Sequence, residues 1–108
     1  MTQHNHLEHW LAQERDILAT LDAGPGPGVA RRDQIAHLNG LEQMQAMLRG
    51  ELPYAPIAKT LDFLIVEVAE GVAIFQGTPR AEHLNPMGTV HGGWFATLLD
   101  SALGCAIH

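Results

Sequence analysis

The sequence predicts an α+β domain, and three patterns in its 108 residues support this prediction. Apolar residues recur at helical spacing from about residue 5 to residue 22, and again from Asp33 to about residue 48. Two short runs rich in apolar and β-branched residues flank Glu70-Gly71, which is typical of a β-hairpin. From Trp94 to Ile107 the sequence is apolar on nearly all sides, which indicates a buried helix.

The first predicted helix is amphipathic, and a Gly/Pro segment follows it. Its apolar positions are Leu7, Trp10, Leu11, Ile17, Leu18 and Leu21. The stretch "AGPGPGVA" ends the helix, because proline lacks an N–H donor and glycine has an entropic cost in regular elements. We therefore expect a helical extension and linker over residues 1–30 and the main domain over residues 31–108. There Asp33 is placed to cap the second helix, which stops near Gly50.

The first strand of the hairpin is apolar on both faces. One face carries Leu61, Phe63 and Ile65, and the other carries Leu64, Val66 and Val68. A strand of this kind is covered on both sides. We expect a helix on one face and a neighbouring subunit on the other.

The composition argues against several classes of partner. The net charge is −6 and the six basic residues are scattered, so we expect no nucleic-acid partner. No apolar run is long enough to span a bilayer and no signal peptide is visible, so we expect a cytoplasmic protein without a membrane partner. Cys105 is the only cysteine, which fits a reducing compartment.

One acid and two glycines in the last predicted helix suggest a catalytic site. Asp100 is the only charged residue from Trp94 to Ile107, so its carboxylate must be paired, protonated or open to a cleft. Gly92 and Gly93 lie where the helix begins, and a ligand oxygen can approach the free N–H groups there. The aspartate alone can be structural and a glycine pair alone is commonly a turn, but their combination favours catalysis.

Two neighbouring residues are further candidates for the site, whereas a serine or a cysteine nucleophile is disfavoured. His91 is a candidate base, orienting group or core histidine, and Asn85 orients a water or His91, or belongs to an ordinary Asn-Pro turn. A serine hydrolase needs a G-x-S-x-G turn, whereas the only serine, Ser101, lies in "LDSAL". Cys105 lies in an apolar helix, which is more typical of a core residue than of a nucleophile. We expect neither a metal nor another cofactor.

The segment "HLNPMGTVHGGWFATLLDSALGCA", residues 83–106, resembles the active-site segment of hotdog-fold thioesterases of the phenylacetate-degradation type. The shared pattern is H-x-N-x-x-G-x-x-H-G-G, followed by a helix with L-x-D-x-A. The resemblance covers about residues 40–108 and leaves out the first helix. It implies a hotdog fold, in which a curved antiparallel sheet wraps a long central helix. It also implies further strands after this helix, so we expect the fold to be incomplete in these 108 residues.

The resemblance also implies roles for individual residues. Asp100 is expected to be the nucleophile or general base, and Asn85 with the backbone N–H of Gly92 to hold the thioester carbonyl or the attacking water. His91 is expected to shape the turn. Substrate contacts are expected from Gly93, Asn85 and His83.

Helix geometry adds an independent argument that the site is shared between two chains. Gly92 and Asp100 are eight residues apart, which is about 12 Å along a helix. A catalytic base must lie within about 3 Å of its water or carbonyl. Two antiparallel helices from different subunits satisfy both conditions, which matches the dimeric family. We expect a homodimer or dimer of dimers.

These arguments predict hydrolysis of an acyl-CoA or related thioester to a carboxylic acid and a free thiol. One alternative is an acyl-thioester dehydratase of the same fold, with His91 as the base. Another is a non-catalytic acyl-CoA sensor that uses the N-terminal helices as a regulatory module. Release of a free thiol or loss of water separates the two enzymes.

Overall fold

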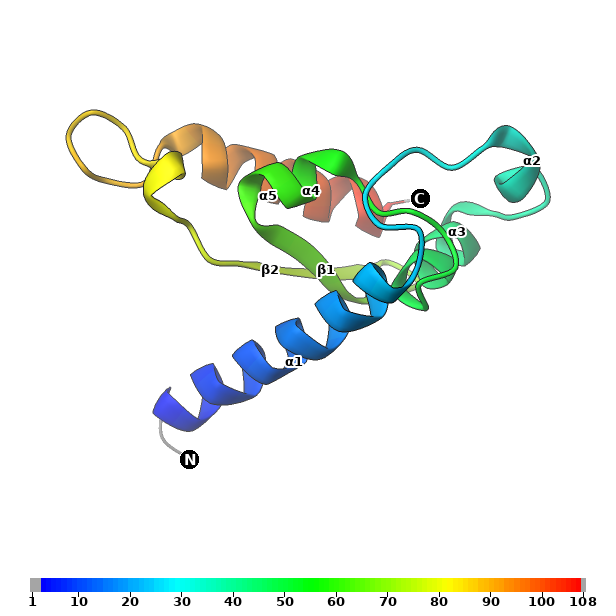
Figure 1. Ribbon diagram of the computed structural model, residues 1–108, viewed down its shortest axis with the longest axis horizontal. Coiled ribbons are helices and arrows are strands. Elements are labelled where there is room, and N and C mark those ends of the chain that lie inside the picture. The colour runs from blue at the N-terminus through cyan, green and yellow to red at the C-terminus, as the bar shows by residue number, and fades with distance from the viewer. Residues whose placement is uncertain (1–2, 108) are drawn as a thin grey trace.

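The computed structural model describes residues 3–107, which form five α-helices, one 3-10 helix and a two-stranded antiparallel sheet. The elements in chain order are α1 (Gln3–Ala23), α2 (Arg32–Ile35), α3 (Gly40–Leu48), α4 (Pro56–Leu61), β1 (Phe63–Ala69), β2 (Val72–Gly77), η1 (Ala81–His83) and α5 (Gly92–Ala106). The predicted α+β class and the hairpin are confirmed. In Figure 1 the hairpin lies between α1 and α5.

The second predicted helix is in fact two helices. The Asn39 Oδ1 accepts the N–H of Glu42 at 2.8 Å, and the Glu42 Oε1 accepts the N–H of Asn39 at 2.9 Å. This reciprocal cap satisfies two donors at the start of α3, so it favours a new helix over continuation of α2. The expected cap at Asp33 is also wrong, because Asp33 lies inside α2 and Arg31 is its N-cap residue.

A β-bulge changes which residues of β1 share a face. The register on β2 shifts by one residue after Ile65, at Val66. Such an extra residue reverses the alternation of faces beyond it. Val68 pairs with Ala73 and therefore shares a face with Ile65, whereas unbroken alternation places it with Leu64.

Helices of the same chain cover both faces of the hairpin at the start of β1. On one face, the rings of Phe63 and Trp94 of α5 lie edge to face with their centroids 6.4 Å apart. On the other face, the Gln76 Nε2 donates to the Gln13 Oε1 of α1 at 3.0 Å. The first four residues of β1 are buried as a result. At the start of β1 the cover on both faces thus comes from one chain, and the expected neighbouring subunit stays a prediction.

The Gly/Pro segment holds α1 against the remainder of the fold. The Gly28 N–H donates to the Tyr54 carbonyl at 2.9 Å, and the Tyr54 N–H donates to the Gly26 carbonyl at 3.2 Å. Leu21 of α1 lies in one buried cluster with Tyr54 and Phe63. Residues on the two sides of the predicted boundary at residue 30 thus share a hydrophobic core.

Helix α5 is buried on one side only, although its sequence predicts burial all round. Trp94 is its one fully buried residue. The apolar side chains of Phe95, Leu99 and Leu103, spaced four residues apart, stay exposed, and Leu103 is 67% exposed. No helix within residues 3–107 is long and apolar enough to cross a membrane.

Candidate functional site

The start of α5 presents a free backbone donor. His91 is the N-cap residue, and its Nδ1 accepts the N–H of Gly93 at 2.8 Å. Within residues 3–107 the N–H of Gly92 donates no hydrogen bond. A β-carbon at Gly92 would meet no atom within 4 Å, so packing does not require glycine there. An incoming oxygen therefore has open access to this donor at the positive end of the helix dipole.

The side chain of Asn85 organises the loop that precedes α5. Its Oδ1 accepts the N–H groups of Met87 at 3.0 Å and Thr89 at 3.2 Å. Its Nδ2 donates to the Thr89 Oγ1 at 2.7 Å. A side-chain amide has two N–H donors, so one N–H of Asn85 remains for a substrate or a water.

His83 is buried and both of its ring nitrogens have partners. The Nδ1 accepts the N–H of Arg80 at 2.9 Å, and the Nε2 lies 3.2 Å from the Thr60 carbonyl oxygen. A carbonyl accepts only, so Nε2 carries the proton. In this arrangement His83 joins η1 to α4 and offers no ring nitrogen to a substrate.

Three of the predicted site residues lie around one hollow. His83, His91 and Gly93 line a hollow of about 360 Å³ beside Trp94. Asn85 is not part of this lining, although its neighbour Leu84 is. The hollow thus gathers the start of α5 and the buried histidine but no carboxylate from α5.

Asp100 lies at a different place, beside an apolar cavity. Its side chain is exposed and lines this cavity. Of the three predicted states of this carboxylate (paired, protonated or open to a cleft), the structure therefore shows the last. The cavity has a volume of about 270 Å³. It shares no lining residue with the hollow at His91. One chain therefore keeps Asp100 apart from the Gly92 donor, as the rise of a helix requires.

The lining of this cavity includes residues that the sequence patterns did not single out. Met44 and Met47 of α3 line it together with Tyr54 and Phe63. The helical spacing of Met44 and Met47 was visible, but nothing local shows that α3 and α5 line the same cavity. The α5 side contributes Asp100, Ser101, Gly104 and Cys105. Burial raises the pKa of the Cys105 thiol, so this thiol stays neutral at physiological pH and is a poor nucleophile.

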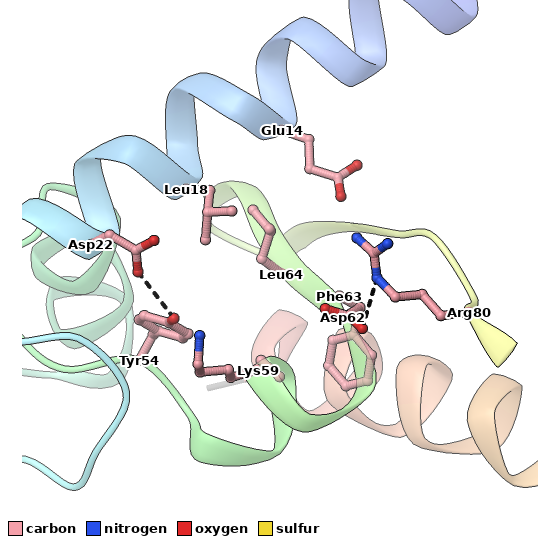
Figure 2. A pocket seen from close by; sticks show the side chains of 10 residues that line it. Glu14, Leu18, Asp22, Tyr54, Lys59, Asp62, Phe63, Leu64 and Arg80 are labelled. Carbon is pink, nitrogen blue, oxygen red and sulfur yellow. Dashed lines mark hydrogen bonds and ion pairs between the residues drawn. The ribbon is translucent and has the colours of Figure 1, made fainter. Parts of the chain in front are cut away.

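A polar pocket of about 110 Å³ lies between α1 and the start of β1 (Figure 2). The Arg80 Nε lies 3.0 Å from the Asp62 Oδ2, and the Tyr54 hydroxyl donates to the Asp22 Oδ1 at 3.3 Å. Figure 2 shows the carboxyl of Glu14 on the same side as the Arg80 guanidinium. Among residues 3–107 no group of three His, Cys, Asp or Glu side chains can hold a metal ion. At this pocket, the hydrogen bond from Tyr54 to Asp22 connects α1 to the rest of the fold.

No protein-family model, no curated protein and no solved structure matches this chain. Its function therefore has to be argued from its own residues and their geometry.

Proposed function

We propose that this protein hydrolyses an acyl thioester, such as an acyl-CoA, to a carboxylic acid and a free thiol. The observation that carries the proposal is Asp100, an exposed carboxylate at a largely apolar cavity of about 270 Å³. An apolar cavity favours the hydrocarbon part of a substrate. A carboxylate beside it is available to attack the thioester carbonyl or to activate a water.

The free N–H of Gly92 supplies the second half of the site. A thioester oxygen that accepts this N–H is stabilised as it becomes negative in the transition state. Since Asp100 and Gly92 of one chain are too far apart, the carboxylate and the donor come from two chains. The catalytic unit is thus a homodimer or dimer of dimers with a hotdog fold, in which α5 helices lie antiparallel. The exposed side chains of Phe95, Leu99 and Leu103 suit such a contact.

Four residues around the donor have supporting roles in this proposal. The Nδ1 of His91 accepts the N–H of Gly93, and this cap leaves the N–H of Gly92 free. Asn85 offers its remaining N–H to the carbonyl or the water. Gly93 lines the hollow and also lets His91 cap the helix, because a β-carbon at Gly93 would lie 3.0 Å from the His91 Nδ1. His83 supports the wall of the hollow from behind.

A dehydratase is the second candidate, and the exposure of His91 favours it. With Nδ1 accepting the Gly93 N–H, the Nε2 of neutral His91 carries the ring proton at the hollow of about 360 Å³, so His91 acts as the base only once it gives up the Gly93 N–H. Such an enzyme removes water from a 3-hydroxyacyl thioester without release of thiol. The products therefore separate the two reactions.

The deciding experiment measures thiol release from a panel of acyl-CoA substrates. Asp100→Asn keeps the shape of the side chain but removes its basic oxygen, so turnover should fall by several orders of magnitude with little change in stability. Asp16→Asn, at an exposed aspartate of α1, is the matched control and should keep full turnover. Near-normal thiol release by Asp100→Asn would refute this mechanism. Binding of acyl-CoA without turnover by the wild type would point to a sensor.

A further inference from the structure

The cavity beside Asp100 is closed in part by the N-terminal helix. Leu21 of α1 and Met44 and Met47 of α3 line it, and we call these three residues the apolar wall. They carry no hydrogen-bond donor, whereas the side from α5 holds a carboxylate, a hydroxyl and a thiol. A ligand with a polar reacting group and a hydrocarbon chain matches this division.

The end of α1 is held in place where it meets α3. A β-carbon on Gly24 would lie 2.2 Å from the carbonyl oxygen of Gly50, so the two backbones touch directly. Gly50 has a φ of +76°, and a β-carbon there would lie 2.7 Å from the Thr20 carbonyl oxygen. Leu21, one residue further on, is 1% exposed. The wall therefore has a rigid part at Leu21.

The two methionines form the adaptable part of the wall. Met44 and Met47 are only half-buried. Methionine side chains are unbranched and flexible, and they adjust to the ligands that they contact. A change of size at either position therefore alters the cavity with less disturbance of the backbone than a change at Leu21.

The cavity volume indicates the size of the hydrocarbon. A cavity of about 150 Å³ lined by Leu, Ile and Phe holds one benzene molecule. In proportion, a cavity of about 270 Å³ holds about ten to eleven carbon atoms. We propose that the apolar wall of Leu21, Met44 and Met47 limits the acyl group to about ten carbons, which makes α1 a specificity element. This inference rests on the proposed function, since that function assigns the cavity to the acyl group.

Binding of straight-chain 1-alkanols from butanol to dodecanol, measured by titration calorimetry, tests the limit without any thioester. Alkanols are neutral, so the carboxylate of Asp100 does not repel them as it would repel fatty acids. Each added methylene should increase the affinity about fourfold while it enters the cavity. The increase should stop at about ten carbons, in proportion to the cavity volume. An affinity that rises evenly through dodecanol, or no binding at all, would overturn the inference.

Variants of the apolar wall should move this limit in opposite directions. Met44→Phe makes the cavity smaller and should shorten the limit by about one carbon, in proportion to the volume lost. Met47→Ala and the milder Leu21→Val enlarge it and should strengthen dodecanol binding by severalfold. Met87→Ala changes a methionine that is 79% exposed and outside the cavity, so it should leave the series unchanged. Circular dichroism checks that each variant is folded.

The outcomes separate this inference from the proposed function. If Met44→Phe and Leu21→Val both fold and both leave the limit in place, the wall does not select chain length and the inference is wrong. If thioester hydrolysis occurs but its chain-length profile ignores these variants, only the inference fails. A length limit that responds to the wall, with no hydrolysis of any acyl-CoA, overturns only the proposed function.

Discussion

His91 determines which backbone donor at the start of α5 is available. The histidine accepts the N–H of Gly93 through Nδ1, and this leaves the N–H of Gly92 free. The adjacent glycine allows the contact, since a β-carbon at Gly93 would lie 3.0 Å from the same nitrogen. The sequence left His91 as base, orienting group or core residue, and the structure identifies it as the helix cap.

Glu14 should make the stability of the fold depend on pH. Burial raises the pKa of its carboxyl above the ordinary 4.5, more than the Arg80 guanidinium lowers it. The neutral form is therefore favoured in the folded state, and the stabilisation is lost as the pH rises through the folded pKa. Glu14→Gln stays neutral, so it should unfold at a higher temperature than the wild type at pH 7 and at nearly the same temperature at pH 4.

Thermal unfolding followed by circular dichroism measures this difference. Glu82→Gln, at an exposed carboxyl in η1, is the control for the same change of side chain. If Glu14→Gln melted below the wild type at pH 7, its ionised carboxylate would be stabilising and the assignment would fail.

The contact between the end of α1 and the end of α3 depends on two glycines. A β-carbon at Gly24 would clash with the Gly50 carbonyl oxygen, and a β-carbon at Gly50 would clash with the Thr20 carbonyl oxygen, so neither position has room for one. Tyr54, paired with the Gly/Pro segment on one side and bonded to Asp22 on the other, fixes the same region. These contacts explain why α1 lines the cavity although a Gly/Pro segment follows it.

Two glycine substitutions distinguish how close packing and backbone strain each affect the free energy of unfolding. Gly50 and Gly71 both have positive φ, at +76° and +73°, but a β-carbon at Gly71 would meet nothing within 4 Å. Gly71→Ala should therefore cost about 1–2 kcal/mol from the left-handed conformation alone. Gly50→Ala adds the clash with the Thr20 carbonyl and should cost clearly more, as measured by urea unfolding. Equal costs would show that α1 moves aside freely.

At the scale of the whole molecule, one apolar face of α5 stays exposed. Phe95, Leu99, Leu103 and Ile107 form one apolar stripe along it. Contiguous apolar surface of this kind marks an interaction site or promotes aggregation. We therefore expect the 108-residue chain to self-associate, and sedimentation that shows a stable monomer with no binding of an apolar dye would contradict this.

Mixing two inactive variants tests whether the site is shared. One variant is Asp100→Asn, and the other is Gly92→Pro, which removes the free N–H at a first helical position where proline is tolerated. A mixed dimer has one site with both defects and one with neither. Random mixing places about half of the chains in mixed dimers, so thiol release should recover to about a quarter of the wild type. Each variant alone should stay near background.

The mixture is prepared by unfolding and refolding the two variants together. A tag on one variant verifies that mixed dimers have formed. If mixed dimers are present and activity stays at background, each site is built within one chain and the two-chain arrangement is wrong.

Some features escaped the sequence arguments although their signal was local. Asn39 and Glu42 form an N-x-x-E capping box, which divides the second predicted helix. The β-bulge at Val66 has no comparable signal in the sequence, because it depends on how β1 and β2 align. The expectation that α5 is buried on nearly all sides was wrong for a similar reason, since burial depends on what packs against a helix and not on its composition.

Local patterns were enough to predict the α+β class, the hairpin turn and the beginning of α5 at His91, because periodicity, turn residues and caps act over a few neighbouring positions. Local patterns could not predict that Leu21, Met47 and Cys105 line one cavity, or which side of α5 stays exposed. These properties come from contacts between segments distant in sequence, and such contacts depend on volume and shape, which hydrophobic patterning alone does not specify.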